Sequence, residues 1–469
     1  MNAERGSETA AAAVEAWSRC LERCRAGAEP EGGLGQAVAK VLPRGGVAAI
    51  RPEGLLLLRG PEAIAEPEDL PDEAVIGWAY DATTSESALS GYDRLILDLL
   101  EAGFRPVAER AGLPEPVAGH EAAPPFRVLR ARRDGYRIRS YRSGDEPAIL
   151  ELFRDSFGSD LSLERWAWKY HHNPRGGPRI SLAFSPGGEL ACQYCAYPVR
   201  WRGLPPTSPA DSHQVGDTMT RRSARSVGRG PTSLLARAAR HFYLVNCRGR
   251  IAFNYGFNTG NIQKFSNRFL GVRQVEEVPY RELPPDKRLR SKRQGKHPLS
   301  RNARLGDRYD LRRIVERSGV GAEFDALFER VSDRYGLLVE RSSEYLRWRY
   351  LDCPAGGPEL IAAYRRGRLV AWAAATRLPD RVEWGDALVD PAERRAVRAL
   401  LAEMRVPGLP VTGWFSDRPR WLSRELDALG MVRRPEPQGL VTGLAPFVRG
   451  DAVSLMRKGY YTKGDSDLF

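Results

Sequence analysis

Cysteine is scarce in this sequence, and long apolar runs are missing from it. Six cysteines in 469 residues are too few for a disulfide scaffold, so we expect a cytoplasmic protein. No apolar run approaches the roughly 18 residues that a membrane-spanning helix needs. The first residues also lack the charged-then-apolar pattern of a signal peptide. We therefore expect neither membrane insertion nor a targeting segment.

Apolar and aromatic side chains are plentiful. Hydrophobic residues make up 42% of the sequence, and ten Trp and fifteen Phe supply large core side chains. Such a composition excludes a wholly disordered chain, and the length predicts about three domains. The 34 prolines and 46 glycines predict many turns and loops.

Positive charge exceeds negative charge by 13, and much of the excess is local. Eight Lys and Arg lie between Pro284 and Arg304, against the single acid Asp286. A run of like charge with Pro and Gly around it is typical of a solvated linker, which we place at residues 284–306. Basic segments also bind nucleic acid, but no zinc-finger spacing or RNA-binding motif accompanies this one. A nucleic-acid partner, in practice tRNA, is therefore the alternative rather than the expectation.

One segment of the sequence occurs twice, 180 residues apart. Residues 162–178 read SLERWAWKYHHNPRGGP, and residues 342–358 read SSEYLRWRYLDCPAGGP, with eight identical positions and no gap. Both copies lead into two β-rich runs around a short turn, at residues 180–196 and 360–375, which predicts a hairpin after each copy. The chain therefore contains two copies of one structural unit.

Helices are expected before each copy, with apolar faces that pack on a sheet. The first helix follows Asp145 as its cap and carries Ile149, Leu152, Phe153 and Phe157; the second carries Phe324, Leu327, Phe328 and Val331. Large aromatics are mostly buried, so the repeated apolar positions are expected in the core, with an acceptor pocket as the alternative. These positions are Trp166, Trp168, Tyr170, Leu346, Trp348 and Tyr350.

The residues before the first unit form a separate segment in which we find no chemistry. An alanine-rich helix, a hairpin across Pro52-Glu53-Gly54 and a helix near residues 93–102 are expected there. The predicted organisation is an N-terminal accessory domain of unknown role (1–125), a first unit (126–283), the basic linker (284–306) and a second unit (307–469). The fold class is α/β (α+β), with two mixed-sheet units in tandem and a small N-terminal α/β domain.

A glycine-rich loop in the first unit lies between a strand and a helix. The strand-like residues 213–219 precede Arg225-Ser226-Val227-Gly228-Arg229-Gly230, and Pro231 opens a helix through Phe242. Glycines let a backbone curl round a pyrophosphate, which the N–H groups and the helix N-terminus then bind. The two arginines would add charge-assisted hydrogen bonds. A second strand, residues 250–257, leads into Asn258-Thr259-Gly260-Asn261 and a helix ending at Leu270-Gly271.

With these motifs the sequence resembles the GNAT N-acetyltransferase superfamily. The loop 225–230 is similar to that family's [RQ]-x-x-G-x-[GA] acyl-CoA motif, and Gly256-Phe257-Asn258 with its helix resembles the later CoA-contacting elements. The repeated Trp-Lys/Arg-Tyr-x-x-x-Pro pattern and residues 461–467 resemble bacterial tandem-GNAT proteins. The resemblance covers residues 126–469 and implies acetyl-CoA (acyl-CoA) as co-substrate, without a metal. The residues that it places at the co-substrate are Met219, Arg225, Val227, Gly228, Arg229, Gly230, Thr232, Asn258 and Asn261.

The resemblance also implies direct transfer, in which an amine attacks a thioester seated between two splayed strands and a backbone N–H polarises the carbonyl. Asp217 and His213 are the candidate bases. For Asp217 the sequence favours the other available role, as a cap of the loop after it, and for His213 it favours a structural role. The tail acids Asp465 and Asp467 either reach the cleft and bind a cationic amine or belong to a frayed terminus.

Two positions depart from the family's pattern. Asn267 stands where the family often has the tyrosine that acts as general acid, so no acid is assigned. The corresponding loop of the second unit reads Asp390-Pro391-Ala392-Glu393-Arg394-Arg395, without glycine and with two carboxylates where phosphates would lie. We therefore expect a degenerate second unit that binds no CoA.

Together these features predict an acyl-CoA-dependent N-acyltransferase, most simply an N-acetyltransferase, that acts on an amine of a small molecule or sugar-like acceptor. A tandem-GNAT aminoacyl transferase using charged tRNA is one alternative; it would suit the basic linker, although such enzymes dispense with the glycine loop. A non-catalytic CoA-binding protein is the other, because the tyrosine is missing. The acceptor, the acyl-chain length and the oligomeric state are left open by the sequence.

Overall fold

The computed structural model describes residues 47–51, 54–58, 73–79, 85–112, 126–285, 308–354, 356–448 and 451–469. The alanine-rich helix expected near the start and nearly all of the basic linker lie outside these residues. The chain separates into two compact units, which we take one at a time. The first comprises residues 1–140, 181–193 and 220–244, and the second comprises residues 141–180, 194–219 and 245–469.

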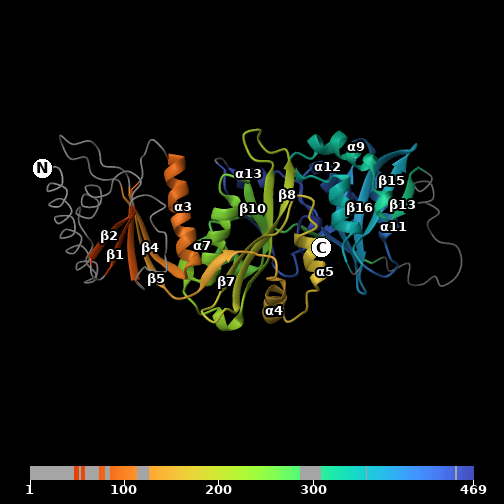
Figure 1. Ribbon diagram of the computed structural model, residues 1–469. Helices are drawn as coiled ribbons and strands as arrows, with labels where there is room; N and C mark the ends of the chain where they lie inside the picture. The colour runs from red at the N-terminus through yellow and green to blue at the C-terminus, as the bar shows by residue number, and fades with distance from the viewer. Residues whose placement is uncertain are drawn as a thin grey trace, which may run out of the picture. The chain divides into compact units, whose positions relative to one another are not determined.

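The first unit contains an antiparallel sheet with the order β2-β1-β3-β5-β4 (Figure 1). Its strands are β1 (Val47–Arg51), β2 (Gly54–Leu58), β3 (Glu73–Ala79), β4 (Phe104–Gly112) and β5 (Phe126–Arg133). β1 and β2 pair with Arg51 opposite Gly54, which confirms the hairpin expected there. β5 pairs with β3 and β4, so this sheet extends to residue 133. Helix α3 (Ser85–Glu101) buries Leu95, Ile96 and Leu99.

A second sheet has the order β11-β20-β10-β9-β8-β7-β6, with β14 (Leu338–Val339) paired to β8. Its strands are β6 (Arg137–Ser140), β7 (Arg179–Phe184), β8 (Leu190–Arg202), β9 (Asp211–Thr220), β10 (Phe253–Asn258), β11 (Arg273–Glu277) and β20 (Val441–Pro446). β9 and β10 run parallel, whereas β20 pairs antiparallel with both β10 and β11. The sheet is therefore mixed.

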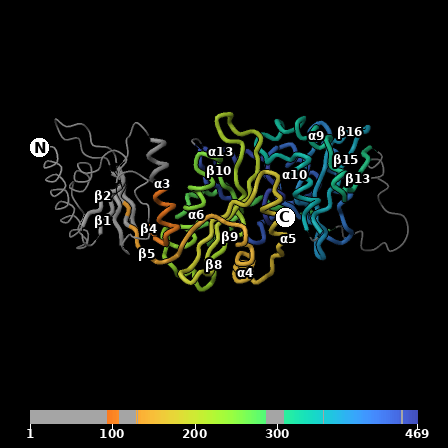
Figure 2. The backbone as a smooth tube through the Cα atoms, viewed as in Figure 1, coloured from red at the N-terminus to blue at the C-terminus, as the bar shows by residue number. Residues whose placement is uncertain are grey.

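A third sheet has the order β13-β15-β16-β17-β18-β12-β19, and Figure 2 shows β13, β15 and β16 side by side. Its strands are β12 (Tyr280–Leu283), β13 (Asp310–Ile314), β15 (Glu359–Arg365), β16 (Arg368–Arg377), β17 (Val382–Val389), β18 (Val411–Trp414) and β19 (Val432–Arg433). Again the two central neighbours, β17 and β18, run parallel. Two mixed sheets of one plan confirm the α/β class and the hairpins that the sequence predicts after each copy.

Each mixed sheet contains one strand from the other half of the chain. β20 lies between β10 and β11, with Gly443 opposite Gly256. β12 follows β11 directly in the chain but lies between β18 and β19, with Tyr280 opposite Trp414. Neither sheet is complete without its exchanged strand.

Helices accompany both mixed sheets. They are α4 (Glu146–Phe157), α5 (Leu163–Tyr170), α6 (Leu234–Phe242), α7 (Gly260–Phe269), α9 (Ala322–Val331), α10 (Ser343–Leu346, continued by a π-helical turn, Arg347–Leu351), α11 (Ala396–Met404), α12 (Arg420–Ala428) and α13 (Ala452–Arg457). Within the part of the chain that the structure describes, no helix combines the length and apolar character needed to cross a membrane.

The repeated aromatic positions lie in the core, as predicted. All six are at most 4% exposed: Trp166, Trp168, Tyr170, Leu346, Trp348 and Tyr350. The helices that carry them begin alike, because the hydroxyls of Ser162 and Ser342 accept a hydrogen bond from the third residue of α5 and α10.

Two expectations for α4 are wrong. Asp145 stands at its N-cap, but the side chain makes no capping hydrogen bond and instead accepts one from the amide of Arg142 at 2.7 Å. Ile149 and Leu152 are buried as expected, whereas Phe157 is 52% exposed because α4 ends there.

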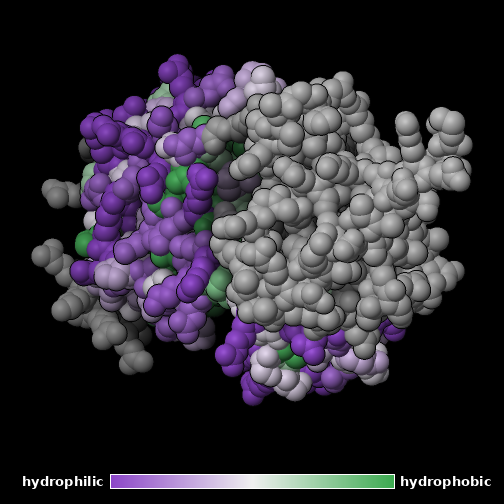
Figure 3. Space-filling view, turned by 90° about the vertical axis from the view of Figure 1, so that its left-hand side faces the viewer, coloured by the Kyte–Doolittle hydropathy of each residue, from purple (hydrophilic) through white to green (hydrophobic). Residues whose placement is uncertain are grey.

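Hydrophilic side chains dominate the described surface visible in Figure 3, with small hydrophobic areas between them. Among the described residues, the large apolar side chains that stay exposed are Val107, Phe157, Leu163, Val315, Val432 and Leu468. Isolated exposed apolar residues are ordinary, but two of these six belong to the wall of a cavity.

Candidate active site

A cavity of about 490 Å³ opens in the second unit where β9 and β10 part. The parallel strands pair only at His213 with Asn254 and Gln214 with Tyr255. Residues 215–218 of β9 and 254–258 of β10 line the cavity, together with α4, α5, α7 and residues 467–469. The volume lies within the range of about 300–1,000 Å³ that is usual for small-molecule sites.

Beyond Gln214 and Tyr255 the facing edges of the two strands have no strand pairing with each other. The far edge of β10 is occupied, because residues 253–258 all pair with β20. An extended ligand with amide groups can therefore use the inner edges as a further strand would. Thr218 also lines the cavity, and its hydroxyl is buried without a hydrogen-bond partner within the described residues. A buried polar atom of this kind calls for a ligand or a water.

Asp217 lies at an irregular point of β9. Its φ of 44° is in the left-handed region, which non-glycine residues rarely adopt and which is concentrated at functional sites. Its Oδ2 accepts hydrogen bonds from Lys169 Nζ at 2.7 Å and Tyr170 Oη at 2.8 Å. Asp217 Oδ2 thus binds two side chains of α5. The sequence had instead favoured Asp217 as a cap of the loop that follows β9.

Lys169 lies between two carboxylates. Its Nζ is 2.7 Å from Asp217 Oδ2 and 3.4 Å from Asp467 Oδ2, and the side chains of all three residues are less than a fifth exposed. Burial lowers the pKa of Lys169, but the two carboxylates outweigh it and raise that pKa above its usual range. Lys169 is therefore an ammonium group, and it orients the carboxylates rather than accepting a proton.

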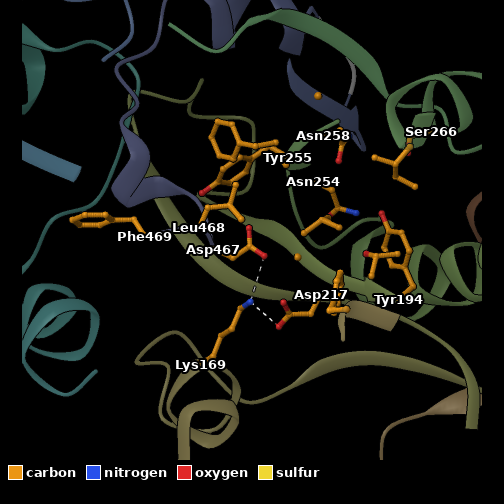
Figure 4. A pocket seen from close by; sticks show the side chains of 18 of the residues that line it. Lys169, Tyr194, Asp217, Asn254, Tyr255, Asn258, Ser266, Asp467, Leu468 and Phe469 are labelled. Carbon is orange, nitrogen blue, oxygen red and sulfur yellow. Dashed lines mark hydrogen bonds and ion pairs between the residues drawn. The ribbon is translucent and has the colours of Figure 1, made fainter. Parts of the chain in front are cut away.

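Asp467 reaches the cavity from near the end of the chain, and Figure 4 shows its carboxylate above the Lys169 ammonium, with Asp217 beside that ammonium. Gln214 Nε2 donates to its Oδ1 at 3.1 Å. The Asp467 carboxylate lies against Gly216, where a Cβ would displace it. The sequence left open whether this acid reaches the cleft or belongs to a frayed terminus, and in the structure it reaches the cavity.

The segment before Asp467 is held by buried ionic contacts. Arg341 donates to Asp465 Oδ2 at 2.8 Å, and both side chains are fully buried. The guanidinium of Arg349 donates to the carbonyls of Gly464 and Ser466. Asp465 is thus a structural anchor, and Asp467 is the tail acid that reaches the cavity.

His213, the other base suggested by the sequence, is 3% exposed and does not line the cavity. Its Nδ1 lies 3.8 Å from the Cys247 sulfur. Burial, together with a smaller effect of the positive charge of Arg179, lowers the pKa of His213 to about 3. Within the geometry shown, Asp217 reaches the cavity and His213 does not.

The glycine loop lies in the first unit. Gly228 and Gly230 have φ values of 69° and 55°, and a Cβ on Gly228 would clash with the Thr232 carbonyl. Pro231 opens a 3-10 turn (Gly230–Thr232) rather than the helix itself, which starts at Leu234 with Ser233 as its cap. Arg225 and Arg229 are exposed. The amides of Ser226 and Gly228 have no acceptor within the described residues, as an anion-binding loop requires.

The other residues that the resemblance places at the co-substrate have different surroundings. Met219 is 2% exposed, and Val227 is half-buried in the loop. Thr232 Oγ1 donates to the Arg229 carbonyl at 3.0 Å. Asn258 lines the cavity and donates to Gln263 Oε1 at 2.9 Å, whereas Asn261 is exposed on α7. Gln263 in turn donates to Asn267, so the position of the missing tyrosine belongs to an amide chain.

The corresponding place in the third sheet is filled. Gly385-Asp386 matches Gly216-Asp217, but a Cβ on Gly385 would clash with the ring of Phe469. Asp386 is fully buried and accepts hydrogen bonds from Arg341 at 3.0 Å and Tyr350 at 2.7 Å. A carboxylate held in this way has no access to a ligand.

The acids of the glycine-free loop face the protein and not an open phosphate position. Asp390 is within 3.1 Å of Arg330 and accepts from the Ala392 amide at 2.9 Å. Glu393 pairs with Arg365 and accepts from Tyr309 Oη at 2.9 Å. Both acids are structural, so the absence of a glycine turn, more than repulsion by free charge, distinguishes this loop from the first.

Sequence reasoning missed Lys169, Gln214 and the Tyr170 hydroxyl as parts of the site. A signal for Lys169 was present, because Lys169 and Arg349 occupy the same place in the two copies of the repeat. A cation at a repeated position among buried aromatic residues needs an acidic partner. Nothing local indicates which acid that is, since Asp467 lies 298 residues away.

Comparison with known proteins yields only distant structural likeness. No family model matches the chain, and no curated protein matches its sequence. An Enterococcus faecalis protein described as a probable N-acyltransferase is 14% identical with a TM-score of 0.45, over 66% of this chain and 71% of that one. A GCN5-related N-acetyltransferase from Kribbella flavida has the same values. Saccharomyces cerevisiae N-myristoyltransferase with bound myristoyl-CoA is 13% identical with a TM-score of 0.43, over 73% of this chain and 88% of that one.

Proposed function

We propose that the protein is an acyl-CoA-dependent N-acyltransferase of the GNAT superfamily, with acetyl-CoA as the donor to be tested first. The observation that carries the proposal is the parting of the parallel strands β9 and β10 beside Asp217, whose backbone is in the left-handed region. This arrangement combines unpaired strand edges with a carboxylate at one cavity wall. It offers an extended thioester donor and an amine acceptor a common cavity.

The chain has suitable groups for the donor. The inner edges of β9 and β10 suit the amides of a pantetheine arm, and the buried Thr218 hydroxyl lacks a partner within the described residues. For the pyrophosphate we propose the loop amides of Ser226 and Gly228 with the exposed Arg225 and Arg229. Met219, Val227, Gly230, Thr232, Asn258 and Asn261 complete the set that the resemblance implies.

Asp217 is the proposed base, and Lys169 and Tyr170 are its positioning residues. The acceptor nitrogen forms a bond to the thioester carbonyl carbon, the carbon–sulfur bond breaks and the sulfur leaves as a thiolate. The nitrogen gives its proton to Asp217, directly or through a water. A thiolate leaves without strong acid help, so Asn267 in place of a tyrosine is compatible with turnover. We do not assign catalysis to His213, because it does not line the cavity.

The second copy is proposed to bind no donor, since Phe469 fills the place beside Gly385. The cytoplasm is the proposed location, because the described cysteines are free thiols, as expected in a reducing compartment. The alternative that uses charged tRNA depends on residues 284–306, most of which lie outside the described residues. No described feature favours that alternative.

The test measures CoA release from acetyl-CoA with a panel of primary amines at pH 7.5. Asp217→Asn should lower kcat by about 10²–10⁴-fold, the usual contribution of a general base. Asp211→Asn is the matched control, because Asp211 begins the same strand, is 45% exposed and pairs with Arg200. A ligand at one hundred times its Kd stabilises the native state by about 2.7 kcal/mol, so donor binding is read from thermal unfolding. Binding without CoA release would favour the non-catalytic alternative. The absence of both donor binding and CoA release would overturn the proposal.

A further inference from the structure

The cavity between β9 and β10 has two chemically different walls. One carries the charged group of Lys169, Asp217 and Asp467. The other comes from α4 and the residues after it, and includes Phe153, Phe157 and Leu161. A ligand that fills the cavity therefore meets charge at one end and apolar surface at the other.

The charged wall has an excess of negative charge. Lys169 supplies one positive charge against two carboxylates, and its distance to Asp467 Oδ2, 3.4 Å, is the longer of the two. A carboxylate accepts up to about four hydrogen bonds, whereas Asp467 has two such contacts within the described residues, from Lys169 and Gln214. Asp467 therefore retains capacity for a further donor from the cavity.

Two other cations line the cavity, and neither neutralises this pair of acids. Arg349 directs its guanidinium at the carbonyls of Gly464 and Ser466. Arg165 lies exposed in the first turn of α5 and has no ion pair with a described acid. The local field at Asp217 and Asp467 thus favours a cationic group.

The apolar wall is partly exposed, and none of the described elements covers it. Phe157 is 52% exposed although its ring packs against Phe153 with centroids 4.7 Å apart. An exposed aromatic pair beside a cavity is the usual contact surface for an apolar ligand body. Nearby Leu163 is equally exposed, at 55%, but does not line the cavity, so it provides a matched control.

We propose that the acceptor is a primary amine with an apolar body, of the arylalkylamine class, and that Asp467 is an acceptor-binding residue. The ammonium lies at Asp217 and Asp467, and the body packs on Phe153 and Phe157. The ammonium loses one proton to solvent water before the neutral amine attacks the thioester, and the second proton goes to Asp217 as in the proposed transfer. This inference rests on the proposed function and narrows it, because an amino sugar would place hydroxyl groups against the aromatic pair. It also gives residues 463–469, anchored by Arg341 and Arg349, a place in the site.

The kinetic test compares phenethylamine with glucosamine, using acetyl-CoA as donor. Phenethylamine should have a kcat/KM at least about tenfold higher, since apolar contacts discriminate by about 10–200-fold. Asp467→Asn should raise the KM for phenethylamine about tenfold or more and leave the KM for acetyl-CoA unchanged. Asp380→Asn, on an exposed acid away from the cavity, should change neither. Phe157→Ala should lower kcat/KM for phenethylamine but not for ethylamine, and Leu163→Ala should leave both unchanged.

A binding test keeps the inference falsifiable if no transfer is found. Phenethylamine should raise the Tm of the full chain, its neutral analogue phenethyl alcohol should not, and Asp467→Asn should abolish the shift. If this pattern holds while no amine is acylated, the acceptor site stands and the proposed transferase function fails. Equal shifts with amine and alcohol, an unchanged shift in Asp467→Asn, or glucosamine as the better substrate would overturn the inference.

Discussion

Trp168 and Trp348 donate their indole N–H groups to each other's backbone carbonyl, at 2.6 and 2.8 Å. Their rings stack with centroids 5.7 Å apart. The two residues occupy the same place in the repeat, so this contact relates the copies as a two-fold axis relates the subunits of a dimer. The exchange of β12 and β20 between the mixed sheets has the same reciprocal character.

Replacing one of these tryptophans should cost more than its packing alone. Trp168→Phe leaves the buried Trp348 carbonyl without its donor, and an unpaired buried polar group costs about 1–3 kcal/mol. We expect urea unfolding to show a loss in that range for Trp168→Phe and for Trp348→Phe. The double variant should deviate from additivity by about 0.5–3 kcal/mol, as residues in contact do. Strict additivity would argue that the two hydrogen bonds do not act as a pair.

The exchanged strands predict that neither half of the chain folds alone. Residues 1–285 lack β20, which separates β10 from β11, and residues 308–469 lack β12, which separates β18 from β19. Residues 308–469 alone should therefore unfold without a cooperative transition, and residues 1–285 alone should show at most a transition of the N-terminal sheet. Mixing the two should restore the transition of the intact chain. Circular dichroism melting with gel filtration provides the readout. As a control, cleavage of the intact protein within residues 286–307 should leave the halves associated. A half that melts cooperatively by itself at the Tm of the intact chain would contradict the prediction.

The glycine loop is better tested through its arginines than through Gly228. A side chain at Gly228 would clash with the Thr232 carbonyl and would strain a φ of 69°, so loss of binding there has two causes. Arg225→Ala and Arg229→Ala should each weaken acetyl-CoA binding about tenfold or more, since hydrogen bonds to charged groups contribute about 1.5–3 kcal/mol. The Tm without ligand should stay unchanged because both side chains are exposed. Arg398→Ala serves as the control, because Arg398 is exposed on α11. Wild-type affinity for acetyl-CoA in both loop variants would show that the pyrophosphate does not bind at this loop.

Two buried histidines predict a loss of stability in mild acid. Burial lowers the pKa of His213 to about 3 and that of His241 to about 4. In the unfolded chain both take up a proton below about pH 6.5, so the unfolded state binds more protons between that pH and the folded pKa values. The free energy of unfolding should therefore fall as the pH drops from 7 to 5, by at most about 1.4 kcal/mol per pH unit for each histidine. His241→Gln should make this slope shallower and His172→Gln, on an exposed histidine, should not; an unchanged slope in His241→Gln would refute the assignment.

Patterns that act within a few residues were predictable from the sequence. The period of apolar positions placed α9 and the hairpins β7–β8 and β15–β16, and the core aromatics of both repeats are buried as expected. Phe157 shows the limit of such reasoning, because it has the spacing of the buried face but lies at the end of α4, where no described element covers it.

The sequence by itself determined the duplication, the mixed α/β class and the glycine loop, because each is a local pattern of backbone preference and side-chain size. Only the tertiary structure decided which strands complete each sheet and which acids meet Lys169. Asp217 and Asp467 are 48 and 298 residues from Lys169 along the chain. Contacts over such separations depend on packing of the whole fold, and no local propensity distinguishes one acid from another. The tertiary fold therefore decides that Lys169, Asp217 and Asp467 meet. The proposed class of acceptor depends on this meeting.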